Sequence, residues 1–219
     1  MALGYTMVYG IAKMLNFAHG DIIMVGAYAV ISTVSLAQLP GVVGVAVSVV
    51  VCVFLGVTIE FLAYRPLRKA PSLAVLITAI GVSYLLQSLA LLVFKSEPKA
   101  FPTIIEIPSL TFGGVVVDGM TLLTLAVTAV IMISLSLFIN KTKLGKAMRA
   151  VSEDKDAAEL MGISVNRTIT MTFAIGSALA AVASVFYGAT YTYIKPTTGS
   201  MPGIKAFTAA VFGGIGSIP

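Results

Sequence analysis

Long uncharged apolar runs alternate with short charged loops along most of the chain. Residues 22–59 carry no charge, and Pro40-Gly41 divides this stretch into two segments joined by a tight turn. Three further uncharged runs cover residues 72–94, 120–139 and 168–194. Each run is long enough for a helix, which rises about 1.5 Å per residue, to cross about 30 Å of hydrocarbon.

These runs are rich in Val, Ile and Thr, but an open sheet would leave unpaired backbone groups in lipid, and barrel strands read as ~10-residue alternating segments. Hydrophobic residues make up 58% of the chain and charged residues 11%, with a mean hydropathy of +1.01. Soluble domains have about 25% charged residues. The sequence predicts an all-α polytopic membrane protein, a single transmembrane permease domain over residues 1–219, built as a helical bundle with discontinuous helices.

Lysines and arginines gather in two of the loops. Residues 64–71 and 140–167 carry nine of them: Arg65, Arg68, Lys69, Lys141, Lys143, Lys146, Arg149, Lys155 and Arg167. The loop at residues 95–119 has two lysines, offset by Glu97, Glu106 and Asp118. The positive-inside rule places the first two loops in the cytoplasm and the third outside. The net charge of +5 thus reflects membrane orientation, and nucleic-acid binding is not expected.

Two apolar stretches are interrupted in a way that is typical of transport pathways. Residues 16–21 (NFAHGD) separate residues 1–12 from 22–39, and residues 199–219 contain several Gly and Pro residues. The tentative pathway residues are Asn16, Phe17, His19, Gly213 and Gly214. The plainer alternatives are that Asp21 is the N-cap of the following helix and that His19 is a hydrogen-bonded interfacial residue.

A stripe of small residues occurs in the last apolar run. Gly176, Ala180, Ser184 and Gly188 are spaced four apart, which lines one helix face and permits close helix packing. Glu60 lies near the cytoplasmic end of its helix, within reach of Tyr64 and Arg65. It is predicted to form an ion pair at the membrane interface. Neither metal nor cofactor is expected, because His19 has no Cys or His companion and Cys52 lies alone in an apolar run.

The loop at residues 140–167 is predicted to contain a short helix at about residues 153–161. Ser152 is a candidate N-cap, acidic residues follow in the first turn, and Gly162 is a natural stop. Its apolar side chains are Ala157, Ala158, Leu160 and Met161. They suit either a helix lying on the membrane surface or one presented to a groove on a cytoplasmic partner.

Several ordered motifs together resemble the permeases of branched-chain amino acid ABC importers of the LivH type. They are LGYTMVYG at residues 3–10, NFAHG at 16–20, AYRPLR at 63–68 and KAFTAAVFGGIGSIP at 205–219. The resemblance covers essentially the whole chain. It implies that the sequence is a fragment of a longer protein lacking both termini, located in the bacterial inner membrane.

The resemblance also implies partners: a second homologous permease, two cytoplasmic ATPases and a periplasmic substrate-binding protein. In this family an ATPase-coupling motif would fall on Asp156, Ala157, Ala158, Glu159, Leu160 and Gly162, with Asp in place of the usual first Glu. No G-x-x-x-x-G-K-[ST] sequence occurs, so nucleotide is expected to bind in the partner, and the chain is not itself an enzyme. The alternatives are a urea or short-amide importer, or a secondary transporter or channel.

Overall fold

The computed structural model describes residues 1–68, 70–104, 107–112 and 115–214. Lys69, Glu106 and the end of the 205–219 motif lie outside these residues. The helices and π-helical turns are α1 (Ala2–Ala12), α2 (His19–Ile31), η1 (Ser32–Leu36), α3 (Gly41–Ile59), η2 (Glu60–Tyr64), α4 (Ser72–Phe94), α5 (Gly119–Lys141), α6 (Lys143–Glu153), α7 (Lys155–Leu160), α8 (Val165–Tyr191) and α9 (Ser200–Phe212).

Five of the helical segments are long and apolar enough to cross a membrane. They are His19–Leu36, Gly41–Tyr64, Ser72–Phe94, Gly119–Lys141 and Val165–Tyr191. The predicted spans are therefore confirmed, including the break at Pro40, which directly precedes α3. The chain is an all-α polytopic membrane protein, and its few strands are short: β1 (Lys99–Ala100), β2 (Leu110–Phe112), β3 (Val115–Val117) and β4 (Tyr193–Ile194).

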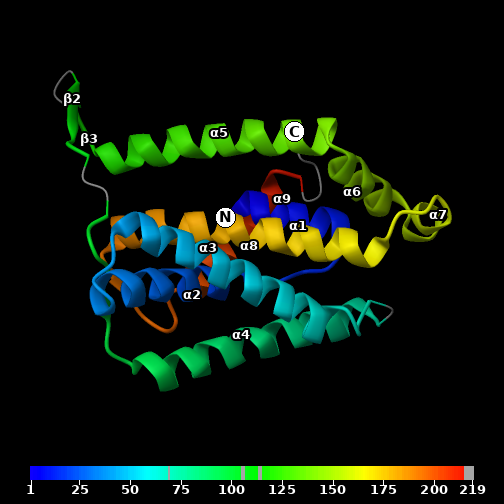
Figure 1. Cartoon of the computed structure of the whole chain (residues 1–219), viewed down its shortest axis with the longest axis horizontal. Helices are drawn as coiled ribbons and strands as arrows, with labels where there is room; N and C mark the ends of the chain where they lie inside the picture. The colour runs from blue at the N-terminus through cyan, green and yellow to red at the C-terminus, as the bar shows by residue number, and fades with distance from the viewer. Residues whose placement is uncertain (69, 105–106, 113–114, 215–219) are drawn as a thin grey trace.

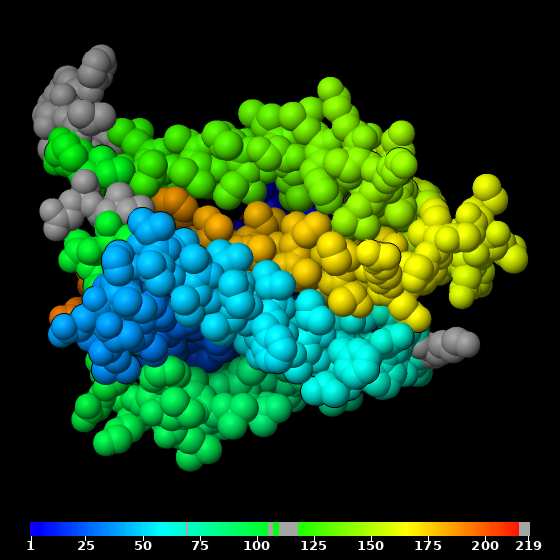
Figure 2. Space-filling view, viewed as in Figure 1, coloured from blue at the N-terminus to red at the C-terminus, as the bar shows by residue number. Residues whose placement is uncertain are grey.

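The centre of the bundle is formed by α1, α2, α3 and α8, while α4 and α5 lie at its two edges (Figure 1; Figure 2). Small residues bring the central helices together. Gly56 of α3 faces Ser177 of α8, and Gly26 of α2 faces Ser48 and Ser184. By contrast, only 11% of the α5 span is buried in the chain, which leaves most of its apolar surface for lipid.

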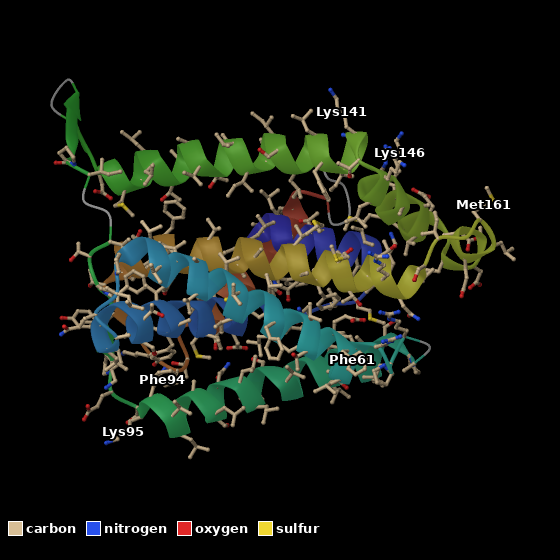
Figure 3. The ribbon with its side chains drawn as sticks, in the orientation of Figure 1. Phe61, Phe94, Lys95, Lys141, Lys146 and Met161 are labelled. Atoms are coloured by element: carbon tan, nitrogen blue, oxygen red, sulfur yellow. The ribbon has the colours of Figure 1, made fainter. Side chains whose placement is uncertain are left out.

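The loops gather at the two ends of the bundle as the charge pattern requires. The turn after η2 lies at the same end as α6 and α7, and Lys95 lies at the opposite end (Figure 3). At that opposite end β1 pairs antiparallel with β4, and β2 with β3. The base-rich loops thus share one side of the membrane.

Thiol labelling should assign that side to the cytoplasm. In a Cys52→Ala background, Glu97→Cys should react with a membrane-impermeant thiol reagent in intact cells, and Glu159→Cys should react only after lysis, because bases favour the cytoplasmic side. Both positions are exposed, so access to the reagent depends on sidedness alone. Labelling of Glu159→Cys from outside with Glu97→Cys protected would reverse the orientation.

Candidate functional site

Two helices begin against each other inside the bundle. α2 starts at His19 and α9 at Ser200, although these residues are far apart in the sequence. A Cβ atom on Gly20 would lie 2.9 Å from the Cα atom of Gly203 and closer still to the carbonyl oxygen of Gly199. The backbones therefore touch directly, which only glycine permits here. The two interrupted stretches singled out in the sequence meet at this point.

Asp21 is the charged residue at this meeting point. It lies in the first turn of α2 and is not the N-cap, which is Ala18. Its carboxylate accepts hydrogen bonds from the Ser83 hydroxyl and from Gln87 Nε2, the latter at 3.0 Å. Gln87 Nε2 also lies 3.1 Å from Ser200 Oγ, so one polar cluster joins α2, α4 and α9.

Ser83, Gln87 and Ser200 were missed by the sequence reasoning. A signal was present for two of them, because Ser83 and Gln87 lie four residues apart on one face of α4, within an uncharged span. An amide in such a span needs a polar partner. Next to the cluster is a cavity of about 220 Å³ lined by Phe17, Ile80, Ser83, Tyr84, Gln87, Ser200, Gly203 and Ile204.

Asn16, Phe17 and His19 surround the start of α2. Asn16 is buried, and its Oδ1 accepts a hydrogen bond of 2.9 Å from the Tyr64 hydroxyl. The Phe17 ring lies 5.4 Å from that of Phe207 in α9. His19 is 2% exposed and packs edge-on against Tyr5 at 5.5 Å.

The position of His19 contradicts the alternative that it is a hydrogen-bonded residue at the membrane interface. Its ring contacts Gly4 of α1 and lies close to Gly176, near the middle of α8, and its Nε2 has no hydrogen-bond partner among the described residues. Gly213 and Gly214 do not join this group. They follow the last residue of α9, which lies about 18 Å along the helix from Ser200 at about 1.5 Å per residue. The glycines that lie against the start of α2 are instead Gly199 and Gly203.

The small-residue stripe of α8 packs within this chain. Gly176, Ala180, Ser184 and Gly188 are all buried. Gly176 lies close to the Gly4 carbonyl of α1, Ser184 faces Gly26 of α2, and Gly188 lies against the ring of Phe101. The small residues of the stripe thus allow α1, α2 and the loop after β1 to pack closely against α8.

The loop at residues 140–167 contains two helices where one was predicted. Ser152 lies in the last turn of α6, where its hydroxyl donates to the Arg149 carbonyl, and is not an N-cap. The N-cap of α7 is Asp154, whose carboxylate accepts from the backbone N–H groups of Asp156 and Ala157. Gly162 has φ +81°, which explains its place after the helix.

The apolar side chains of α7 divide between two surroundings. Ala158 is 4% exposed and packs into this chain, whereas Leu160 is 90% and Met161 82% exposed. Figure 3 shows Met161 at the far end of the molecule, beyond the spanning helices. Ala158 therefore supports α7 from within, and Leu160 and Met161 present the apolar surface.

Polar contacts tie this end of the molecule to the spanning helices. Glu60 pairs with Arg68 and not with Arg65, and it accepts a 2.8 Å hydrogen bond from Thr170 of α8. The Lys155 amine donates to the carbonyl of Ala12, the last residue of α1, at 3.2 Å. Burial, reinforced by the nearby Arg68 and Lys13, lowers the pKa of Lys155. Among the described residues no group of three or more His, Cys, Asp or Glu could hold a metal ion.

Comparison with known proteins places these features in context. The sequence matches the family described as "Branched-chain amino acid transport system / permease component" over residues 1–219. It is 46% identical to the high-affinity branched-chain amino acid transport system permease protein BraD of Pseudomonas aeruginosa, over 100% of this chain and 75% of BraD. It is 40% identical to the corresponding LivH proteins of Salmonella typhimurium and Escherichia coli, again over 100% of this chain and 75% of each relative. No solved structure matches the chain.

Proposed function

Because the chain belongs to the family of permease components of branched-chain amino acid transport systems, we propose that it is the membrane-spanning subunit of an ATP-driven importer. In this role it carries leucine, isoleucine and valine across the bacterial inner membrane by alternating access. The observation that carries the proposal is the similarity to BraD and LivH over the whole of this chain. Both relatives are named for branched-chain amino acid transport, which favours those substrates over urea or short amides.

The meeting point of α2 and α9 supports a pathway for such substrates. Two helix N-termini concentrate partial positive charge, which favours a carboxylate. The buried Asp21 carboxylate, hydrogen-bonded to the cavity-lining Ser83 and Gln87, adds negative charge beside the cavity, which favours an ammonium group. Phe17, Ile80 and Ile204 add apolar surface to the adjacent cavity. An amino acid with a branched apolar side chain combines these three chemistries.

The end of the molecule that carries α7 supports coupling to an ATPase. Leu160 and Met161 are exposed there and fit an apolar groove on a partner. Lys155 connects α7 to the end of α1, whose Gly4 and Tyr5 pack on His19. A movement of α7 would therefore be passed along α1 toward the pathway.

Reconstitution tests the function as a whole. The chain would be co-expressed with a second permease, two ATPases and a periplasmic binding protein, and the complex placed in proteoliposomes. Labelled leucine delivered by the binding protein should accumulate only when ATP is supplied on the ATPase side. Uptake that follows a proton or sodium gradient without ATP would contradict the proposal.

Replacing Asp21 with asparagine should lower leucine transport about ten- to one-hundred-fold. The change keeps the shape of the side chain but removes the charge, and a hydrogen bond to a charged group contributes about 1.5–3 kcal/mol. ATP-dependent uptake would be measured alongside copurification with the ATPases, which should not change. Ser88→Ala, at an exposed position of α4 next to Gln87, is the control and should transport normally. Normal uptake by Asp21→Asn would remove Asp21 from the pathway.

A further inference from the structure

The exposed face of α6 is a stripe of bases. Lys143, Lys146 and Arg149 are spaced three apart and are all exposed, whereas Gly145, Met148 and Val151 are buried on the opposite side of the helix. Lys141, the last residue of α5, is also exposed and precedes the first base of the stripe by two residues. α6 is thus amphipathic, with its apolar side turned to the bundle and its basic side turned away.

The positive charge of this stripe is not compensated within the described part of the chain. The ion pair found among the described residues joins Glu60 and Arg68, at another site. Arg149 donates a 3.3 Å hydrogen bond to Asn140, which is neutral, and the exposed Glu153 one turn away forms no ion pair with it. Lys143 and Lys146 lie in the first turns of α6, where the helix dipole disfavours cations. A bound anion would relieve this repulsion.

The stripe lies at the edge of the bundle and begins where the membrane-spanning helix α5 ends. A single residue, Thr142, separates α5 from α6, and its hydroxyl caps α6 by accepting from the Gly145 N–H. In Figure 3 the side chains of Lys141 and Lys146 point away from the bundle, whereas Met161 lies farther along the bundle axis. These two lysines therefore project sideways from the end of a spanning helix, and not into the region beyond α7.

We propose that Lys141, Lys143, Lys146 and Arg149 form a binding site for the anionic headgroups of phospholipids in the leaflet at this end of the bundle. Phosphate oxygens accept charge-assisted hydrogen bonds from Lys and Arg, and basic clusters on amphipathic helices attract anionic lipid surfaces. The site would hold α6, and with it α7, at a fixed depth. It does not depend on which solute the protein transports.

Lipid titration of the purified full chain tests the proposal. Bound lipid would be counted by native mass spectrometry with phosphatidylglycerol and, separately, phosphatidylcholine. The triple variant Lys143→Gln/Lys146→Gln/Arg149→Gln should bind phosphatidylglycerol about one-hundred-fold more weakly at low salt, since each base contributes roughly five-fold. Phosphatidylcholine binding should not change. Added salt should weaken binding to the wild type, because these charges are exposed.

Three further variants make the outcome decisive. Lys95→Gln/Lys99→Gln/Lys195→Gln removes the same charge from the opposite end and should keep the difference between the two lipids. Lys143→Arg/Lys146→Arg should bind normally, and Lys146→Gln alone should lose roughly five-fold even if the triple variant misfolds. Unchanged phosphatidylglycerol binding by Lys146→Gln and the triple variant would overturn the proposal. Loss of ATPase association with lipid binding intact would assign the stripe to a protein partner instead.

Discussion

Replacing Gly20 with alanine should abolish transport and lower the stability of the bundle by about 1–3 kcal/mol or more. A Cβ atom there would overlap the Gly199 carbonyl oxygen and approach Gly203 Cα to 2.9 Å. Both neighbours are backbone atoms, so no side-chain rotation can relieve the overlap. α2 and α9 would have to separate, so that Asp21 and Ser200 could no longer both bond to Gln87. Leucine uptake and thermal unfolding would both be measured in the assembled transporter.

Gly81 provides the matched control for this prediction. It lies within α4 near Ser83, but a Cβ atom placed on it would have no neighbour within 4 Å. Gly81→Ala should therefore leave transport intact and stabilise its helix by up to about 1 kcal/mol, the intrinsic preference of alanine over glycine. If Gly20→Ala behaved in the same way, the two helix starts would not be in functional contact.

The spanning helices could be predicted from the sequence because uncharged length is a local property. Residues 72–94 coincide with α4, since Pro71 precedes the run and Lys95 ends it. The contact between Gly20 and Gly199 could not be predicted in the same way. Hydrophobic pattern determines which segments form helices, but not which helix starts face each other across the bundle. The density of glycines in the sequence points to Gly213 and Gly214, whereas the close approach of the two backbones occurs at Gly199 and Gly203.

The helix near Gly162 shows the same limit at a finer scale. The sequence predicts Ser152 as the N-cap, but Asp154, an equally good N-cap residue, takes that position in the structure. The structure continues α6 through Ser152 because its apolar side packs on α1 and α8, so that the next helix can start only after Asp154. With that register Ala158 turns inward. The apolar character of Ala158 and Leu160 was readable from the sequence, but not which of them is exposed.

Charged substitutions at Leu160 and Met161 should uncouple the permease from ATP without disturbing its fold. These side chains are 90% and 82% exposed, so Leu160→Asp and Met161→Asp cost the isolated chain little. In a partner's apolar groove each aspartate would bury an unpaired charge. Loss of a central interface side chain costs about 2–4 kcal/mol, or roughly thirty- to one-thousand-fold in affinity. Copurification with the ATPase and substrate-stimulated ATP hydrolysis would both be measured in proteoliposomes.

Two variants at neighbouring positions distinguish loss of the ATPase contact from misfolding of the chain. Glu159→Gln, between an inward-facing and an outward-facing residue of α7, keeps the exposed apolar surface and should retain most of the ATPase association. Ala158→Glu would instead place a charge against this chain's own core, so it should lower the yield of folded protein before any effect on coupling can be measured. Normal ATPase association and transport by both Leu160→Asp and Met161→Asp would show that α7 is not the coupling helix. The ATPase would then have to engage another surface at this end of the bundle, and the connection from Lys155 to α1 would play no part in transmitting its movement.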